Sequence, residues 1–336
     1  MIKLYKGDCL IESDKIESGS VDLILTDLPY GTMTKLNYKE QIQCRGENSF
    51  KWDEVVDTKK VYEIANRILR KNGKMVLFCQ QPFTTELITK AIPNIPFSYS
   101  MIWEKDNYGH ALLAKKAPLN YYEDVLVFSK NHDTEAIHEL RPYFKIVMDY
   151  IGLNLKQINT KLGHRRAEHT FYVTPKKAII AEIGQKADHT FRIGSTQFGL
   201  CTEKTYLELI DVFGINKMQG FKEFTELKKI DNEFKQRLAS TFNLWEGKKY
   251  KSNILKYKKD YDGHHPTQKP VLLLEDLIKT FSNENDLVVD LTMGSGSTLV
   301  ACKNTNRNGI GIEMNDEYFN IATERINKEE PQKELF

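Results

Sequence analysis

The chain has 336 residues, a formal net charge of +2 and 40% hydrophobic residues. This length allows one large domain or two ordinary ones, and the near-neutral charge gives no general indication of a polyanionic partner. No apolar run approaches the ~18 residues of a membrane helix, and the N-terminus lacks a signal-peptide pattern, so we expect a soluble cytoplasmic protein with no membrane partner. The five cysteines are scattered without a CxxC pair, which favours reduced thiols over a disulfide framework or a zinc site.

Short β-rich runs alternate with helical patterns in the first and last parts of the chain. Strands are expected at 2–5, 22–26, 74–78, 98–103, 124–128, 286–290 and 309–313. Helices are expected at 58–71, 83–91, 268–281, 297–306 and 315–327. Several strand runs are apolar throughout, as in strands that are buried on both faces of a parallel sheet. The alternation predicts an α/β fold with a doubly wound sheet.

The run at 22–26 ends in Asp27-Leu28-Pro29-Tyr30-Gly31. The Asp27 carboxylate and the Leu28 carbonyl are suited to accept both hydrogens of an exocyclic amino group, which makes its nitrogen more nucleophilic and orients it. Pro29 stiffens the turn, and Tyr30 can stack on a flat ring. The same residue types also form ordinary strand-to-turn exits, so this motif alone does not decide the function.

The middle of the chain, 131–262, breaks the alternation and is richer in charge. Across 141–180 there are eight basic residues against two acidic ones, and 248–259 holds six lysines with two interleaved tyrosines. Clustered positive charge with aromatics suits a nucleic-acid backbone, although a solvated lysine-rich loop is the alternative for 248–259. A weak helix-turn-helix pattern spans 153–166. The expected DNA contacts are Lys161, Arg165, Arg166, Lys248 and Lys249.

A five-residue segment occurs twice in this middle region. Ala167-Glu168-His169-Thr170-Phe171 recurs as Ala187-Asp188-His189-Thr190-Phe191. Two copies are too few for a solenoid, so we interpret them as related hairpin strands with structural histidines.

Near the C-terminus a second apolar run ends in a glycine-rich turn, Asp290-Leu291-Thr292-Met293-Gly294-Ser295-Gly296-Ser297-Thr298. A helix start after such a turn faces an anion, and an acid such as Glu313, nineteen residues after Gly294, can bind ribose hydroxyls. A dinucleotide fingerprint needs Gly or Ala three positions after the second glycine, where this chain has Leu299.

A third motif, His265-Pro266-Thr267-Gln268-Lys269-Pro270, precedes the helix that leads to the glycine turn. Its cation, hydroxyl and amide suit the carboxylate of an amino acid. His264 and His265 have no partners at metal-ligand spacing, so we expect no metal.

These three motifs resemble those of the N6-adenine/N4-cytosine DNA methyltransferase family. Their order, with the target-base motif first and the methyl-donor motif last, matches the β group of that family. Supporting likeness lies at Gly7-Asp8-Cys9, 72–78, 102–105 and 122–128. The resemblance covers roughly 1–130 and 263–325, whereas the middle resembles the family's target-recognition region only in position and basicity.

The resemblance implies a circularly permuted, Rossmann-like methyltransferase sheet of seven strands, one of them antiparallel. It divides the chain into 1–130 with the target-base site, 131–262 as a DNA-binding insert, and 263–336 with the donor half. It implies S-adenosylmethionine as cofactor, with Glu313 on its ribose, Asp8 near its adenine, and Thr267, Gln268 and Lys269 near its methionine end. The donor site then comprises Asp8, His265, Thr267, Gln268, Lys269, Asp290, Thr292, Met293, Gly294, Ser295, Gly296, Thr298 and Glu313.

The implied reaction is methylation of the exocyclic amine of a base flipped out of duplex DNA. The acid at Asp27 favours adenine N6, because the family's N4-cytosine members more often have serine there. One departure is Leu28, where the family usually has proline; leucine retains the needed carbonyl. A homodimer and a cognate restriction enzyme stay open as partners.

Other functions fit the sequence less well. C5-cytosine methylation needs a cysteine presented after proline, and no proline here precedes a cysteine. Protein or RNA methyltransferases use similar acid-Pro-Tyr sites, but the basic insert favours DNA. A DNA-binding regulator with an inactive core and an NAD-dependent oxidoreductase are the remaining alternatives; calorimetric S-adenosylmethionine binding and a hydride-transfer assay would separate them.

Overall fold

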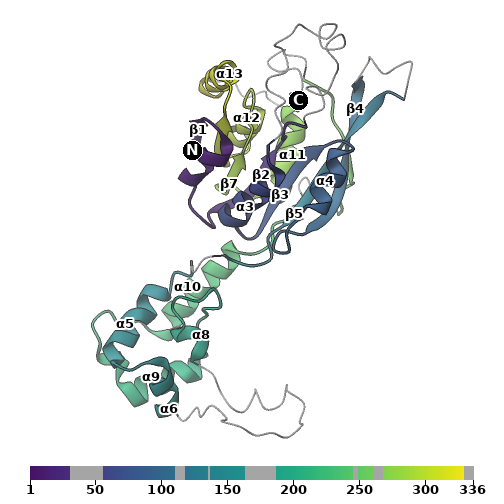
Figure 1. Cartoon of the computed structure of the whole chain (residues 1–336). Helices are drawn as coiled ribbons and strands as arrows, with labels where there is room; N and C mark the ends of the chain where they lie inside the picture. The colour runs from purple at the N-terminus through teal and green to yellow at the C-terminus, as the bar shows by residue number, and fades with distance from the viewer. Residues whose placement is uncertain are drawn as a thin grey trace, which may run out of the picture. The chain divides into compact units, whose positions relative to one another are not determined.

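A computed structural model gives the structure of the chain, which divides into two compact units (Figure 1). It describes residues 1–30, 56–109, 118–134, 137–162, 187–244, 249–260 and 268–328. One unit comprises Met1–His132 with Ser240–Phe336, and the other comprises Asp133–Ala239. Among the described residues, no helix is both long and apolar enough to cross a membrane.

In its described residues, the first unit contains a mixed eight-stranded sheet. Its order is β1 (Ile2–Lys6), β8 (Asn308–Glu313), β7 (Leu287–Asp290), β2 (Val21–Thr26), β3 (Leu69–Cys79), β5 (Asn120–Ser129), β4 (Phe97–Gly109) and β6 (Ile254–Lys256). Neighbouring strands are parallel except where β5 pairs with β3 and β4. All seven expected strands are present, and one strand is antiparallel as expected.

The expected number of seven strands was too small, because β6 adds an eighth at the edge. It pairs in parallel with β4, with Ile102 opposite Ile254. Only Leu255 of its three residues is buried, so the segment shows no apolar run in the sequence.

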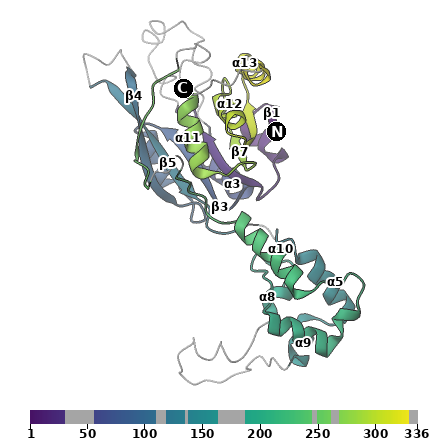
Figure 2. The same ribbon diagram turned by 180° about the vertical axis from the view of Figure 1, so that it is seen from behind.

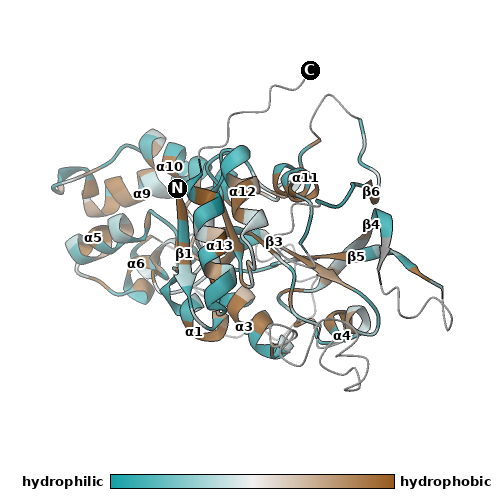
Figure 3. Cartoon of the chain, turned by 90° about the horizontal axis from the view of Figure 1, so that it is seen from above, coloured by the Kyte–Doolittle hydropathy of each residue, from teal (hydrophilic) through white to brown (hydrophobic). Residues whose placement is uncertain are grey.

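Helices cover both faces of the sheet, which makes it doubly wound. The helices α1 (Cys9–Glu12), α3 (Thr58–Ile68) and α4 (Phe83–Thr89) pack on one face. The helices α11 (Val271–Phe281) and α12 (Ser297–Asn304) cover the other, and α13 (Asp316–Asn327) packs near β1. Figures 1 and 2 show the two faces, and Figure 3 shows the apolar central strands between the helix layers.

Alternation within β2 shows why these strands are apolar throughout. Ile24 points into the core under α3, whereas Leu23 and Leu25 point into the core under α11. All six residues of β2 are buried, which is the pattern of a strand covered on both sides.

Described residues 240–244 and 249–260 belong to the sheet unit, although they fall within the expected insert at 131–262. The Asn243 backbone N–H donates to the Thr280 carbonyl at 2.8 Å. Trp103 Nε1 donates to the Tyr257 carbonyl, also at 2.8 Å. The lysine-rich stretch around β6 therefore borders the sheet.

The second unit is helical in its described part. It contains α5 (Arg141–Ile151), α6 (Leu155–Lys161), α8 (Asp188–Phe191), α9 (Glu203–Phe213) and α10 (Phe224–Arg237). A short 3-10 helix, Ile215–Lys217, follows α9; the first unit has a similar one at Ser13–Lys15. Its core includes Phe144, Tyr206, Leu209 and Leu227.

The hairpin interpretation of the repeated segment is wrong for its second copy. Residues 188–191 form α8, with Ala187 and Phe191 buried in the core of the second unit. Packing of these two side chains on one helical turn explains the preference for helix. The first copy, 167–171, lies outside the described residues.

Candidate active site

The site lies at the carboxyl edge of the sheet, between β2 and β7. The chain leaves β2 toward β3 on one side and leaves β7 toward β8 on the other. Ligands of open α/β sheets bind in the crevice where neighbouring connections diverge in this way. The Asp27 motif follows β2 and the glycine turn follows β7, so the two predicted motifs meet at this edge.

Threonine hydroxyls join the two motifs. Thr26 Oγ1 donates to Asp290 Oδ1 at 2.8 Å, and Thr292 Oγ1 donates to the Asp27 carbonyl at 3.0 Å. The Thr292 backbone N–H also donates to Asp290 Oδ1 at 3.1 Å. Sequence reasoning assigned no role to Thr26, which looked like the last residue of an apolar strand.

Asp290 is buried, and its environment changes its protonation. Burial raises the pKa of this carboxyl from 3.8 to about 6, against the lowering effect of hydrogen bonds from Thr298 and Thr26. The folded protein therefore holds this proton more tightly than the unfolded chain does. The resulting stabilisation is fully present below about pH 4 and is lost as the pH rises through about 6.

Asp290→Asn is accordingly expected to raise the free energy of unfolding above that of the wild-type protein at neutral pH, and to gain less over the wild type at pH 4. A shift of this size corresponds to about 3 kcal/mol, and asparagine retains an oxygen for Thr26 without ionising. The measurement is urea unfolding of both proteins at several pH values. A stability difference that does not change between pH 4 and pH 8 would contradict this assignment of Asp290.

Both carboxylate oxygens of Asp27 contact protein side chains. Tyr30 donates its hydroxyl to Oδ1 at 2.7 Å, and Lys269 Nζ donates to Oδ2. The Tyr30 ring lies 5.5 Å from that of Phe83, which fixes its position beside the carboxylate. The Leu28 side chain is buried in the sheet core, so the residue that departs from the family pattern anchors this turn by packing.

Two further charged residues complete this cluster. Glu123 Oε1 lies 2.6 Å from Lys105 Nζ, and Glu123 Oε2 lies 3.3 Å from Lys269 Nζ. Residues 105 and 123 belong to stretches that supported the family resemblance, but no role was assigned to either. A charged residue in a strand that continues into Val125, Leu126 and Val127 is the signal that could have indicated them.

The charges of this cluster shift one another's ionisation. Burial raises the pKa of Asp27, Lys269 opposes this effect, and Glu123 adds to it. Burial also opposes ionisation of Glu123, but Lys269 and Lys105 outweigh it and hold the pKa of that carboxyl below its usual value. The two carboxylates outweigh burial at Lys269 and raise its pKa. Lys269, expected beside the methionine end of the donor, is thus placed against Asp27 and Glu123.

The predicted donor residues gather at the ends of β1, β8 and β7. Glu313 Oε2 accepts from the Gly294 N–H at 3.0 Å, and Oε1 accepts from the Asn315 N–H at 2.7 Å. The Gly7 N–H donates to the Glu313 carbonyl at 2.9 Å, which brings Asp8 beside this strand end. Asp8 itself caps α1 by accepting from the Leu10 N–H at 2.8 Å.

Gly296 is required by the fold. Its φ is +81°, and a Cβ there would lie 2.9 Å from Ala322 Cβ on α13. Met293 is also buried, in the core that contains Ala322. Ser295 Oγ lies 3.4 Å from Gln268 Oε1, and Thr298 is buried beside Asp290.

Several predicted residues fall outside the described part of the chain. These are His265, Thr267, Arg165, Arg166 and Lys248. Lys161 and Lys249 are described and exposed. Arg141, counted among the basic residues of the middle region, is buried and donates to the carbonyls of Ile193 and Ser195. Among described residues, no group of three or more His, Cys, Asp or Glu side chains could hold a metal.

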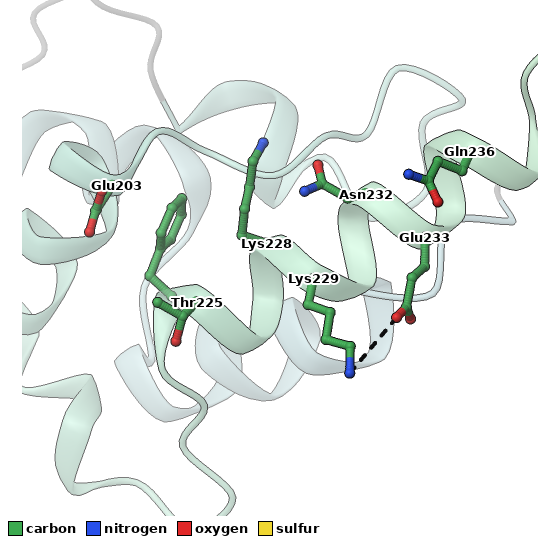
Figure 4. A pocket seen from close by; sticks show the side chains of 8 residues that line it. Glu203, Thr225, Lys228, Lys229, Asn232, Glu233 and Gln236 are labelled. Carbon is green, nitrogen blue, oxygen red and sulfur yellow. Dashed lines mark ion pairs between the residues drawn. The ribbon is translucent and has the colours of Figure 1, made fainter.

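A separate hollow of about 550 Å³ lies in the second unit, along α10 (Figure 4). Its lining includes Lys228 and Lys229 together with Glu203 and Glu233, so its charges balance. None of its lining residues belongs to the predicted sites, and the balanced charge gives it no preference for a polyanion.

The doubly wound sheet and the paired strand-end motifs define an α/β protein of the methyltransferase class. A family model described as DNA methylase (N6_N4_Mtase) matches residues 21–324, and the chain belongs to this family.

Individual relatives agree with this assignment. The chain is 23% identical to the type II methyltransferase M.HindIII of Haemophilus influenzae, over 96% of this chain and 94% of that protein. It is 42% identical to the type II methyltransferase M.HpaI of Haemophilus parainfluenzae, over 28% of each chain. The solved PvuII DNA methyltransferase (cytosine-N4-specific) has a similar fold, with a TM-score of 0.50 and 14% identity over 98% of this chain and 88% of that one.

Proposed function

We propose that this protein transfers a methyl group from S-adenosylmethionine to the exocyclic amine of a base flipped out of duplex DNA, with adenine N6 as the target. The observation that carries this proposal is the joining of Asp27 to the glycine turn through Thr292. The proposed amino-group acceptor and the proposed donor-binding turn therefore meet at one edge of the sheet. Membership of the DNA methylase family supports the same activity.

Asp27 and the Leu28 carbonyl would accept the two hydrogens of the target amine. This arrangement directs the nitrogen lone pair toward the donor and stabilises the positive charge that develops on nitrogen. The Tyr30 ring, held beside the carboxylate, would stack on the flipped base. Pro29 keeps the turn between them stiff.

The donor site fits the chemistry of S-adenosylmethionine. Each Glu313 oxygen accepts one backbone N–H and has a further lone pair for a ribose hydroxyl. Asp8 would lie near the adenine ring, and Gln268 beside Ser295 would lie toward the methionine end. The cofactor supplies an electrophilic methyl group. The order of the motifs along the chain supports a circularly permuted arrangement of the family fold.

The choice between adenine N6 and cytosine N4 rests on Asp27. The deciding experiment incubates unmethylated duplex DNA with the protein and S-adenosylmethionine, then identifies modified nucleosides by mass spectrometry. We expect N6-methyladenine. N4-methylcytosine alone would overturn the base assignment, and the absence of both would overturn the proposed activity.

We further propose that the region 131–262 supplies sequence choice and most of the nonspecific DNA affinity, through Lys161, Arg165, Arg166, Lys248 and Lys249. Charge reversal of Arg165 and Arg166 to glutamate should weaken DNA binding and reduce its salt dependence, because each phosphate contact contributes a slope of about −0.9. DNA binding is measured at several salt concentrations, with S-adenosylmethionine affinity expected to stay unchanged. Reversal of exposed Lys3 is the matched control. Wild-type DNA affinity in the double variant would move recognition elsewhere.

A further inference from the structure

The acceptor proposed for the target amine is already bound to a protein cation. Lys269 Nζ donates to Asp27 Oδ2, while Tyr30 occupies Oδ1. The Lys269 ammonium therefore donates to the same oxygen that is proposed to accept an amino hydrogen of the base. Lys269 is only 7% exposed, so this contact is made with little water to weaken it.

Glu123 provides a second carboxylate acceptor close to the same ammonium. Glu123 Oε2 lies 3.3 Å from Lys269 Nζ, but it receives no hydrogen bond from the described residues. Its other oxygen is held 2.6 Å from Lys105 Nζ, so the carboxylate is fixed in place. A buried carboxylate oxygen without a donor is costly, and a small movement of Lys269 would satisfy it.

We propose that Glu123 is a positioning residue that accepts Lys269 from Asp27 when the target amine enters, and so frees Asp27 Oδ2 for the base. Before entry, the nearby Lys269 ammonium favours the ionised form of Asp27. After entry, its charge is balanced by Glu123. This inference rests on the proposed amine methylation and goes beyond it by assigning Glu123 and Lys269 a shared role.

The charge balance of the cluster favours a transfer over a permanent Lys269–Asp27 pair. Asp27, Glu123, Lys105 and Lys269 sum to zero, so a shift of Lys269 between two carboxylates leaves no uncompensated buried charge. The methylated nitrogen gains positive charge during the reaction. A lysine that stayed on Asp27 would oppose that charge, whereas one withdrawn toward Glu123 would oppose it less.

The test compares Glu123→Gln with Glu104→Gln. Glutamine keeps an oxygen for Lys105 but removes the charge that draws Lys269 away. The control removes the same charge from the adjacent strand, where Glu104 pairs with exposed Lys256. Methyl transfer from radiolabelled S-adenosylmethionine to long unmethylated duplex DNA is measured under single-turnover conditions. We expect about a tenfold to hundredfold slower transfer in Glu123→Gln, with donor affinity and the control rate unchanged.

The pH dependence of the rate separates this role from simple structural support. Asp27 must be ionised to accept the amine, so the rate falls as the pH drops through its pKa. Asp27 faces Lys269, Tyr30 and Glu123, and Glu123 raises its pKa while Lys269 lowers it. Glu123→Gln should therefore move the acidic limb to lower pH, and Lys269→Met should move it to higher pH. A loss of rate without either shift would overturn the proposal.

The double variant Glu123→Gln with Lys269→Met keeps the cluster neutral. It provides a second test in case Glu123→Gln alone folds poorly because of its unbalanced buried charge. Because the blocking ammonium is gone, it should transfer methyl groups faster than Glu123→Gln alone. A double variant no faster than the single one, or a Glu123→Gln rate equal to that of Glu104→Gln, would overturn the transfer of Lys269. Absence of methyl transfer by the wild-type protein would instead overturn the proposed function and this inference with it.

Discussion

Asp27→Ala is expected to lower the rate of DNA methylation by about a hundredfold or more, since it removes a positioned acceptor that acts mainly in the transition state. Affinity for S-adenosylmethionine should stay nearly unchanged, because the residues proposed to bind the donor lie at the ends of other strands. Single-turnover methyl transfer and calorimetric donor binding measure the two effects separately.

The alanine variant also leaves Lys269 with Glu123 as its remaining carboxylate contact among the described pairs. Thermal unfolding should therefore accompany the rate measurement, so that a loss of fold is not read as a loss of chemistry. Asp14→Ala is a suitable control, because Asp14 is an exposed carboxylate in the same unit. A near-normal rate in Asp27→Ala would show that Asp27 does not accept the amine.

The sheet was predictable because its strands are buried on both faces. Apolar runs such as 22–26 leave little choice of structure when helices cover both sides, and all seven expected strands formed. Their ends were predictable too, since the residue that follows a buried parallel strand lies at the sheet edge. Asp27 was found in this way, whereas Glu313 was found from its spacing after Gly294.

Features that depend on long-range contacts were not predictable. The edge strand β6 forms because β4 offers it hydrogen-bonding groups, and its own sequence carries no strand pattern. Residues 188–191 form a helix because Ala187 and Phe191 pack into a helical core. The Glu123–Lys269 contact joins residues far apart in the chain, and only the order of the strands brings them together.

The second large effect is expected at the donor site, where Glu313→Ala should weaken S-adenosylmethionine binding by about a hundredfold. Hydrogen bonds to a charged group contribute about 1.5–3 kcal/mol each, and the variant would lose those proposed to the ribose. It would also release the Gly294 N–H, which Glu313 Oε2 holds at 3.0 Å. Gly296 is a poorer position for this test, because any side chain there would collide with Ala322 and damage the packing of α13.

Calorimetric titration of S-adenosylmethionine into Glu313→Ala and Glu313→Gln measures this effect. Glutamine keeps one acceptor oxygen without the charge, so its affinity should fall between those of alanine and wild type. Glu317→Ala removes an exposed carboxylate from the neighbouring helix and should bind the donor normally. Saturating S-adenosylmethionine should restore much of the methylation rate of Glu313→Ala but none of that of Asp27→Ala, because only the first loses donor affinity. If both variants responded alike to added donor, the division of the crevice into a base side at β2 and a donor side at β7 and β8 would be wrong.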